Sequence, residues 1–296
     1  MDISICIVIA NARSFLRDCL NSIAEYPPRG DYEIIVVDNA SNDGTAAMLF
    51  DEFPQVKIIH NDRNQGFTIP LNQALKVAQG DWLVSLNPDT LLTGELFDTM
   101  RAFMESNPAV GIVSPKVLNR DGSFQKQSRR GEARPLEVIG YFLKLDHLFP
   151  GNKKLAGYLQ GWLGEDEVVE VKAVSGSCMM IRREALEQVG YFDEQFYAYQ
   201  EDSDFCFQVR KQGWKVFYVP TVEVIHYGGQ GGSGTRPYFN VYQWHRSYYL
   251  YFKKNLAKDY FFLFNWFYYG VMGLKLAWAM VITVFRKKKV SGTPKA

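Results

Sequence analysis

Three short apolar segments, each ending where polar residues gather, constrain the fold of this chain most strongly. They are Ile3 to Ile9, Tyr32 to Val37 and Trp82 to Leu86, and all are rich in β-branched or aromatic residues. Stretches with helical spacing separate them, at Ser14 to Tyr26 and at Ile69 to Ala78. Strands that alternate with helices are typical of βαβ units, so the sequence predicts an α/β fold around a mostly parallel central sheet flanked by helices. In such folds, ligands bind at the carboxyl ends of the strands.

The middle of the chain is less regular. Residues 119–170 combine mixed charge with scattered Gly and Pro and show no sustained period, which indicates a variable region. Regularity returns with a strand predicted at Val171 to Arg182, a short helix at Arg183 to Val189 and a longer helix at Glu201 to Gly213. The first turn of the longer helix is heavily acidic, which is favourable at a helix N-terminus.

The C-terminal segment differs in character from the rest. Tyr260 to Phe285 is almost wholly apolar and aromatic, interrupted by Asn265 and Lys275, and the basic run Arg286 to Lys289 follows it. The segment is long enough to span a membrane, but a lysine near its middle is costly there. An interfacial helix fits better, because aromatic residues beside a basic cluster suit an anionic leaflet surface. The alternative is a helix packed on its own domain or on a second subunit of a homo-oligomer.

Composition and charge narrow the classes of function. The chain has 296 residues, of which 47% are hydrophobic and 22% charged, and its formal net charge is +1. This balance is that of a globular domain without the basic stripe of a nucleic-acid-binding protein, so we expect small-molecule substrates and no nucleic acid. The four cysteines have no paired spacing, and the chain passes from Met1 directly into an apolar strand rather than a secretory leader. We therefore expect a reduced, cytoplasmic environment.

Four polar clusters follow apolar segments and are candidates for chemistry. They are Asp38-Asn39-Ala40-Ser41, Asn87-Pro88-Asp89, the acids Glu201, Asp202 and Asp204, and His226 with the glycine-rich residues 228–233. Each has an ordinary structural explanation, because Asn, Ser and Asp cap helices, Pro is common in turns, acids suit helix N-termini and a histidine can end a strand. Each also suits catalysis: carboxylates bind hard cations, neighbouring acids raise each other's pKa, and glycines let the backbone approach phosphates.

Taken together and in order, these residues resemble glycosyltransferase family 2, whose members are inverting enzymes with a GT-A nucleotide-binding fold, and especially its rhamnosyltransferase-like branch. The resemblance covers roughly residues 3 to 252. It rests, in chain order, on Asn11, Val36-Val37-Asp38-Asn39-Ala40-Ser41, Asn64-Gln65-Gly66-Phe67, Asn72, Asn87-Pro88-Asp89, Ser175-Gly176-Ser177-Cys178, Gly190-Tyr191-Phe192-Asp193-Glu194, Glu201-Asp202 and His226-Tyr227-Gly228-Gly229. It implies a GT-A domain over residues 1–255, with 119–170 as a variable acceptor-side region, and an amphipathic or membrane-associated helical tail over 256–296.

The resemblance also implies a role for each residue. Asp202 would be the catalytic base, with Glu201 beside it. Asp89 and His226 would hold Mg²⁺ or Mn²⁺, and the loop after His226 would cover the diphosphate. The nucleotide-sugar donor would be bound by Asn11, Asp38, Asn39, Ser41, Asn64, Gly66, Phe67, Asn72 and Asn87.

The expected reaction moves a sugar to a hydroxyl of a saccharide or lipid-linked saccharide in surface polysaccharide or cell-wall biosynthesis. Rhamnose from dTDP-rhamnose is the first expectation for the donor, and a UDP-sugar is the second. An enzyme of this kind with an aromatic, basic-ended tail would lie in the cytoplasm, peripherally on the inner face of the cell membrane.

Two departures from the family pattern affect these expectations. The first strand ends in Ile9-Ala10-Asn11, where the family usually has Thr-Tyr-Asn, so an aromatic contact near the nucleotide is missing. The usual Asp-x-Asp is Asn87-Pro88-Asp89, which has one carboxylate fewer and should need donor phosphates to complete the shell of the metal.

Other classes of protein fit less well. A dinucleotide-dependent oxidoreductase would carry Gly-x-Gly-x-x-Gly after the first strand, where Asn11-Ala12-Arg13 stands, and the Gly-x-Ser-x-Gly elbow of a hydrolase does not occur. The alternative that we keep is a non-catalytic relative that binds a nucleotide-sugar or glycan within a polysaccharide assembly complex. Asp202 and His226 argue against it, because a pure binder needs neither a base nor a metal.

Overall fold

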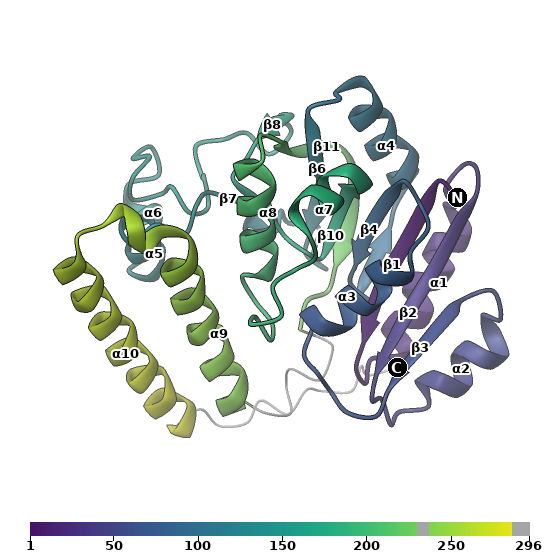
Figure 1. Cartoon of the computed structure of the whole chain (residues 1–296), viewed down its shortest axis with the longest axis horizontal. Coiled ribbons are helices and arrows are strands. Elements are labelled where there is room, and N and C mark those ends of the chain that lie inside the picture. The colour runs from purple at the N-terminus through teal and green to yellow at the C-terminus, as the bar shows by residue number, and fades with distance from the viewer. Residues whose placement is uncertain (230–236, 286–296) are drawn as a thin grey trace.

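The computed structural model of the chain describes residues 1–229 and 237–285. Within them lies one nine-stranded sheet with the order β3-β2-β1-β4-β10-β6-β11-β5, and β8 pairs with β11 (Figure 1). The strands are β1 (Ile3–Ile9), β2 (Tyr32–Asn39), β3 (Lys57–Asn61), β4 (Trp82–Leu86), β5 (Thr90–Leu92), β6 (Val110–Leu118), β8 (Val169–Glu170), β10 (Cys178–Arg182) and β11 (Lys215–His226). β1 is parallel to β2 and β4, and β6 is parallel to β11, whereas β10, β5 and β8 run antiparallel to their neighbours. The predicted α/β fold with a mostly parallel sheet is confirmed.

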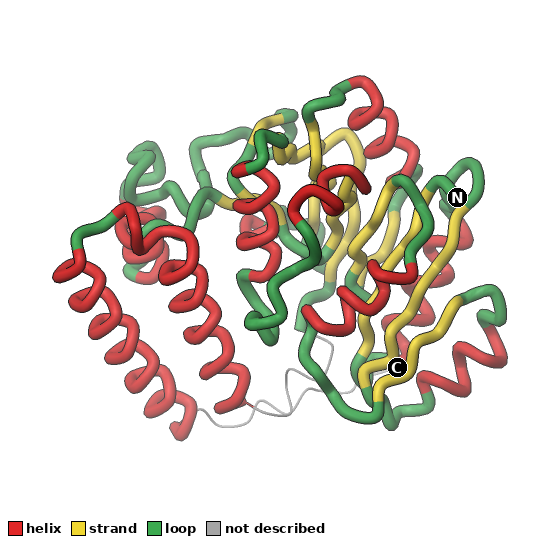
Figure 2. The backbone as a smooth tube through the Cα atoms, in the orientation of Figure 1, coloured by secondary structure: helices red, strands yellow, loops and turns green. Residues whose placement is uncertain are grey.

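Helices cover both faces of this sheet (Figure 2). One apolar core joins the sheet to α1 (Arg13–Glu25), α2 (Thr45–Glu52) and α4 (Leu96–Ser106), and a second joins it to α3 (Thr68–Val77), α7 (Arg183–Val189) and α8 (Glu201–Lys211). The alternation along β1 explains both cores, because Ile5 and Ile7 enter the first while Cys6 and Val8 enter the second. All four cysteines are buried thiols, and no disulfide links them.

A helical group lies beside α8, away from the sheet (Figure 1). It consists of α5 (Pro135–Phe142), α6 (Leu145–Leu148), α9 (Pro237–Tyr251) and α10 (Phe262–Phe285), with a π-helix (Phe252–Leu256) and a 3₁₀ helix (Ala257–Asp259) between α9 and α10. A third core of aromatic side chains, among them Tyr158, Tyr248, Phe252 and Tyr268, holds the group together. The predicted tail helix is therefore confirmed. The proposed domain division at 255/256 falls inside the π-helix and stays a prediction.

The last helix, α10, turns most of its apolar surface away from the protein. It is long and apolar enough to cross a membrane, and only 6% of its most apolar window is buried. Trp266, Phe267, Leu274 and Trp278 are among its exposed side chains. Lys275 lies on the side of α10 that faces the protein, where it contacts α5 and α9. The basic run at 286–289 lies outside the described residues.

One predicted strand is wrong. Val171 to Arg182 was expected to be continuous, but it is divided into β9 (Ala173–Val174), the turn 175–177 and β10. β9 pairs with β7 (Arg129–Arg130) in a separate two-stranded sheet, and β10 pairs with β4 and β6. The chain leaves the ladder because the backbone of the turn has other partners: Ser175 N donates to Ser128 O at 2.8 Å and Gly176 N donates to Asp202 Oδ2 at 3.0 Å.

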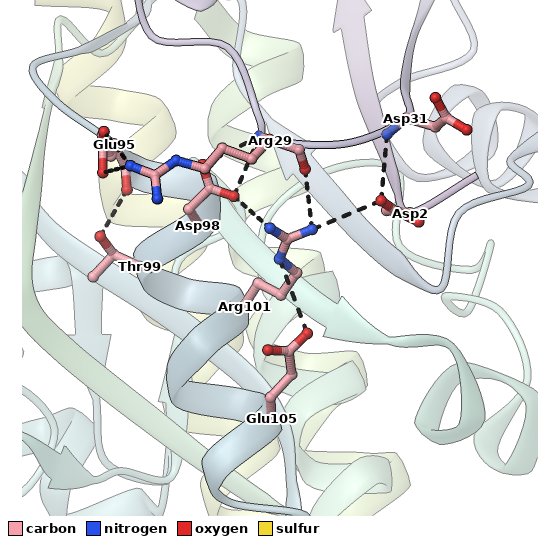
Figure 3. A network of polar contacts seen from close by, with 8 residues as sticks. All are labelled: Asp2, Arg29, Asp31, Glu95, Asp98, Thr99, Arg101 and Glu105. Carbon is pink, nitrogen blue, oxygen red and sulfur yellow. Dashed lines mark hydrogen bonds and ion pairs between the residues drawn. The ribbon is translucent and has the colours of Figure 1, made fainter.

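A surface network of ion pairs connects α4 to the loop before β2 (Figure 3). Arg29 bonds Glu95 at 2.7 Å, and Arg101 bonds Asp98 at 2.7 Å and lies 3.8 Å from Asp2. A single exposed ion pair contributes little to stability. Here the pairs link three segments of the chain, namely the residue before β1, the loop before β2 and α4. Asp2 precedes β1, so this network lies at the amino edge of the sheet, opposite the edge where the candidate site residues gather.

The loop before β4 packs directly on the backbone of β1. Gly80 N donates to the buried Ser4 Oγ at 2.8 Å, and a Cβ at Gly80 would lie 2.6 Å from Ser4 N and 2.7 Å from the carbonyl carbon of Ile3. Because both obstacles are backbone atoms of a buried strand, no side chain can move aside to make room.

We predict that Gly80→Ala lowers the free energy of unfolding by about 2 kcal/mol, the usual cost of overpacking a close contact. Urea denaturation measures this quantity. The matched control is Gly94→Ala, whose Cβ meets no atom within 4 Å and should change stability by less than about 0.5 kcal/mol. Equal stability of the two variants would contradict the close packing.

Candidate functional site

The structure gathers most of the predicted site residues at one edge of the sheet. β1, β2, β4 and β11 all end there, and antiparallel β10 begins there. Asn11, Asp38 and Asn87 follow or end the first three of these strands, and His226 ends β11. Since the carboxyl ends of parallel strands form one edge, residues far apart in the sequence share one surface.

The ends of β1 and β2 are tied to each other by polar contacts. Asn11 N donates to Ser41 Oγ at 3.0 Å, Asn42 N donates to Asn11 Oδ1 at 2.8 Å, and Ser41 N donates to Asp38 Oδ1 at 2.9 Å. Asp38 is fully buried, and its Oδ2 lies 3.2 Å from His60 Nδ1. The contacts of Asn11, Ser41 and Asp38 thus fix the loops after β1 and β2 relative to each other, as a nucleotide pocket requires. Their contact with a donor stays a prediction.

Asn39 uses its whole amide group on a neighbouring loop. Its Nδ2 donates to Asn64 Oδ1 at 3.0 Å and to Gly66 O at 2.7 Å, and its Oδ1 accepts from Gln65 N at 3.0 Å. Asn39 is also buried. We therefore infer that Asn39 serves the donor pocket by holding the 64–66 loop in place.

The 64–67 loop is in turn fixed to the segment that precedes α8. Tyr197 OH donates to Asn64 Oδ1 at 2.9 Å, and Phe67 N donates to Tyr197 O at 2.7 Å. Gly66 has φ +88°, and a Cβ there would collide with the carbonyl oxygen of Tyr197. Only glycine fits this approach. Tyr197 is a residue of the site that the sequence did not single out.

Asn72 has partners other than those expected. It is buried on α3, where its Nδ2 donates to Phe192 O at 2.8 Å and Glu194 Oε1 at 3.0 Å, and its Oδ1 accepts from Phe192 N at 3.1 Å. The side chain therefore fastens the 192–194 turn to α3. Asn72 therefore positions this turn, and its contact with a donor stays a prediction.

Asp89 and His226 meet because β5 pairs with the end of β11, with Thr90 opposite His226. Asp89 Oδ1 lies 3.2 Å from His226 Nε2. On the other side of the ring, Nδ1 lies 2.9 Å from Gln125 Oε1, which only accepts, so Nδ1 carries the proton. Nε2 faces the carboxylate of Asp89, and Asn87 Nδ2 also lies 3.1 Å from it, so a cation bound by Nε2 would take the place of the Asn87 contact.

This pair fits a hard divalent cation with an incomplete protein shell. Two ligands at about 2.1 Å from one ion and at a right angle lie about 3 Å apart, close to the observed separation of Nε2 and Oδ1. In the part of the chain that the structure describes, no group of three or more His, Cys, Asp or Glu side chains gathers to hold a metal. The remaining ligands would be water and phosphate oxygens, which Mg²⁺ commonly keeps. Gln125, in the region predicted to be variable, orients the histidine.

Asp202 lies at the start of α8 and is held by groups of three residues. Its Oδ2 is 2.6 Å from Arg130 Nη2 and accepts from Gly176 N at 3.0 Å, while its Oδ1 accepts from Ser203 N at 2.6 Å. To take a proton from a substrate, the carboxylate must share or release one of these partners. Arg130 is the principal residue that sequence reasoning missed.

Glu201, beside it, is in a different electrostatic state. Burial, followed by the negative charge of Asp202, raises the pKa of Glu201 well above the ordinary glutamate value of 4.5. Its Oε2 has no hydrogen-bond partner among the described residues. The two neighbouring acids are thus distinct: Asp202 is matched by a cation and hydrogen-bond donors, whereas Glu201 favours its protonated form.

An open cavity of about 520 Å³ adjoins the Asp89–His226 pair. Asn119, Arg120, Asp121 and Tyr227 line it. Asn119 Oδ1 accepts from Gln125 Nε2 at 3.1 Å, which connects the wall of the cavity to the histidine. Of the glycine-rich loop expected to cover the diphosphate, Gly228 and Gly229 are described, with φ of +68° and +70°, and residues 230–236 lie outside the described residues.

Comparison with known proteins agrees with this architecture. Residues 4–190 match the sequence model of glycosyl transferase family 2. The N-acetylglucosaminyl-diphospho-decaprenol L-rhamnosyltransferase of Mycobacterium tuberculosis is 29% identical over 231 residues, which are 74% of this chain and 73% of the relative.

Two solved structures share the fold at low sequence identity. The mannosyltransferase of Pyrobaculum calidifontis in complex with GDP-Man and Mn²⁺ matches with a TM-score of 0.58 and 18% identity, over 94% of this chain and 72% of that one. GalNAc-T7 with UDP, GalNAc and Mn²⁺ matches with a TM-score of 0.57 and 18% identity, over 76% of this chain and 43% of that one. The GT-A fold is thereby confirmed.

We predict that Asp89→Ala and His226→Ala each weaken Mn²⁺ binding by about tenfold or more, because each removes one of two protein ligands. Gln125→Leu keeps both ligands but frees the imidazole ring, and should also weaken binding by about tenfold. Titration calorimetry with a nucleoside diphosphate present measures the affinity. His147→Ala is the control, since this exposed histidine of α6 belongs neither to the Asp89–His226 pair nor to the loops around Asp38. Unchanged Mn²⁺ affinity in Asp89→Ala and His226→Ala would rule out a metal site at this pair.

A second prediction concerns Glu201. In the unfolded chain this group ionises above about pH 4.5, whereas in the folded chain its raised pKa delays ionisation, so the wild type loses stability as the pH rises. Glu201→Gln abolishes that loss. The unfolding free energy of Glu201→Gln minus that of the wild type should therefore increase by more than about 1 kcal/mol between about pH 5 and about pH 8. The exposed Glu184→Gln is the matched control, and a pH-independent difference between Glu201→Gln and the wild type would refute the shift.

Proposed function

The chain belongs to glycosyltransferase family 2, and from this we propose that it transfers a sugar from a nucleoside-diphosphate donor to a hydroxyl of a saccharide acceptor, with inversion at the anomeric carbon. One observation carries the proposal. The turn 175–177 connects the two candidate reactive sites: Gly176 N donates to Asp202, and Ser177 O accepts at 2.9 Å from the backbone N of Asn87, two residues before Asp89 of the Asp89–His226 pair. Two adjacent residues of one turn therefore hold the candidate base and the segment that leads into the candidate metal pair.

The proposed step is a direct displacement. The acceptor oxygen attacks the anomeric carbon, the bond to the diphosphate breaks, and Asp202 takes the hydroxyl proton from the opposite face. Arg130 and Gly176 N orient the carboxylate for this task, and Glu201, in its protonated form, adds no negative charge beside the attacking oxygen. A divalent cation bound by Asp89 and His226 would stabilise the charge of the leaving diphosphate.

The finer identity of the substrates rests on the mycobacterial relative. That relative is named as an L-rhamnosyltransferase acting on a diphospho-decaprenol-linked sugar. We therefore propose rhamnose from dTDP-rhamnose as the donor, with a UDP-sugar as the second candidate. We also propose a saccharide carried on a lipid as the acceptor, in surface polysaccharide or cell-wall biosynthesis.

The exposed face of α10 supports a place at a membrane surface. Many of its aromatic and aliphatic side chains are exposed, from Phe262 at its start to Phe285 at its end, which is unfavourable in water and favourable at a bilayer interface. We propose that the protein lies in the cytoplasm, peripherally on the inner face of the membrane, with α10 in the interface. A second copy of the chain covering the same face is the alternative.

Thermal stabilisation by dTDP, UDP and GDP, each with and without Mn²⁺, tests the proposed function. We expect one nucleotide to raise the melting temperature, and only with the metal, because a ligand that binds the folded state stabilises it by mass action. Asp202→Asn should keep this stabilisation and lower turnover by about a hundredfold or more, since it removes the base and leaves the donor contacts.

The exposed Asp51→Asn, on α2, is the matched control and should retain both properties. Loss of nucleotide stabilisation in Asp202→Asn would contradict its role as base. Stabilisation by none of the nucleotides would favour the non-catalytic alternative, for which the occupied oxygens of Asp202 are the supporting observation.

A further inference from the structure

A second cavity, of about 640 Å³, lies away from the proposed transfer step, between the helical group and the loop that follows β6. Aromatic side chains form much of its wall, including Phe142 of α5 and Trp244 of α9. Three lysines also line it, namely Lys126 in the 3₁₀ helix η1 (Lys126–Ser128), Lys144 before α6 and Lys275 of α10. An aromatic wall with several cations is typical of a site for an amphipathic anion.

Lys275 is the central cation. Its Nζ lies 3.6 Å from the ring centroid of Phe142 and 4.3 Å from that of Trp244, and it donates to His245 Nε2 at 3.1 Å. The histidine ring accepts there because its Nδ1 donates to Val241 O at 2.7 Å. Burial lowers the pKa of Lys275 to about 8. No carboxylate of the described residues lies within 4 Å of this ammonium group, so a partly desolvated cation keeps N–H donors for a ligand.

The other charges of the cavity do not neutralise it. Neither Lys126 nor Lys144 pairs with a carboxylate among the described residues. Asp146 is the one acid among the lining residues, and its Oδ2 lies 3.9 Å from His147 Nε2. Three lysines against one carboxylate give the lining a positive potential, which concentrates anions.

The cavity lies between the candidate site and the apolar face of α10. Asn119 lines both this cavity and the one beside His226, and Gln125 bonds both Asn119 and His226. On the other side, Trp244 and Lys275 belong to the α9–α10 pair, whose outer surface is apolar. In Figure 1 this pair stands next to α5 and apart from the sheet.

We propose that this cavity binds the phosphate or diphosphate group of a molecule carried on an apolar chain, with Lys275 as the central ligand and Lys126 and Lys144 at the rim. The apolar chain would run along α10, and the group beyond the phosphate would point towards His226 and Asp202. Identification of that molecule as the acceptor rests on the proposed function. The anion site itself rests only on the cavity and its charges.

Binding of farnesyl diphosphate to the full chain tests the proposal, in EDTA so that no divalent metal contributes. Titration calorimetry should show farnesyl diphosphate binding about tenfold or more tighter than farnesol, because the alcohol lacks the anion. Lys275→Met keeps the apolar stem and should weaken farnesyl diphosphate binding by about tenfold or more, the value of a charge-assisted hydrogen bond.

Two further variants separate binding from folding. Lys126 is exposed, so Lys126→Met leaves the core intact and should still weaken binding, by about threefold or more. The matched control is Lys253→Met, since this lysine lies 5.7 Å from the ring of Tyr249 outside the cavity, and it should bind as the wild type does. Equal affinity of all three variants, or farnesol binding as tightly as farnesyl diphosphate, would overturn the proposal.

Inorganic diphosphate distinguishes the two sources of the anion. If it binds as tightly as farnesyl diphosphate and in the same Lys275-dependent way, the cavity is a site for free phosphate and the lipid-borne assignment is overturned. Nucleotide stabilisation with Mn²⁺ is measured separately, and Lys275→Met should leave it unchanged. If the wild type binds farnesyl diphosphate but no nucleotide, the transferase function is refuted and the anion site stands. If it binds a nucleotide but not farnesyl diphosphate, the anion site is refuted and the transferase function stands.

Discussion

The buried ion pair between Arg130 and Asp202 is the contact on which the geometry of the site depends. Two charges removed from water are costly unless further hydrogen bonds satisfy them. Here Arg130 also donates to Val174 O at 2.9 Å, and Asp202 accepts from Gly176 N. Both extra partners come from the strand β9 and the turn behind it. The pair therefore joins the irregular region after β6, the 175–177 turn and the start of α8 into one unit, and removing either charge would leave the other buried and unmatched.

Buried amides fix the loops on the proposed donor side of the site in the same way. The amide group of Asn39 is hydrogen-bonded to the 64–66 loop, and that of Asn72 is hydrogen-bonded to the 192–194 turn. A side chain with all its hydrogen bonds made inside the protein has little left for a ligand, but it fixes the backbone that meets the ligand. Precise placement of loops is a large part of what an enzyme supplies to a two-substrate reaction. The polar residues that a sequence motif groups together thus divide into some that can face substrate and others that support them.

The regular part of the fold was accessible from the sequence, because strand and helix periods are local. β1, β2 and β4, with α1, α3 and α8, lie within a few residues of their predicted bounds. Arg130 and Gln125 were not accessible, because their significance comes from contacts 72 and 101 residues along the chain, and nothing near them differs from a polar surface segment. The division of the strand predicted at 171–182 has the same origin, since a hydrogen bond from Gly176 N to Asp202 across the fold overrides a local β pattern.

Lys275 shows how a charge within an apolar segment can specify the orientation of a helix. Viewed in the sequence alone, it is an obstacle to membrane contact. In the structure it lies on the side of α10 that packs against Phe142 and Trp244, while Trp266, Leu274 and Trp278 are exposed. A helix that crossed a bilayer alone would have to expose that lysine to lipid on one side. A helix that lies in the interface keeps it against the protein, beside a cavity with two more lysines. The lysine and the apolar face are therefore both accommodated when α10 rests on a membrane surface with α9 behind it, as we propose.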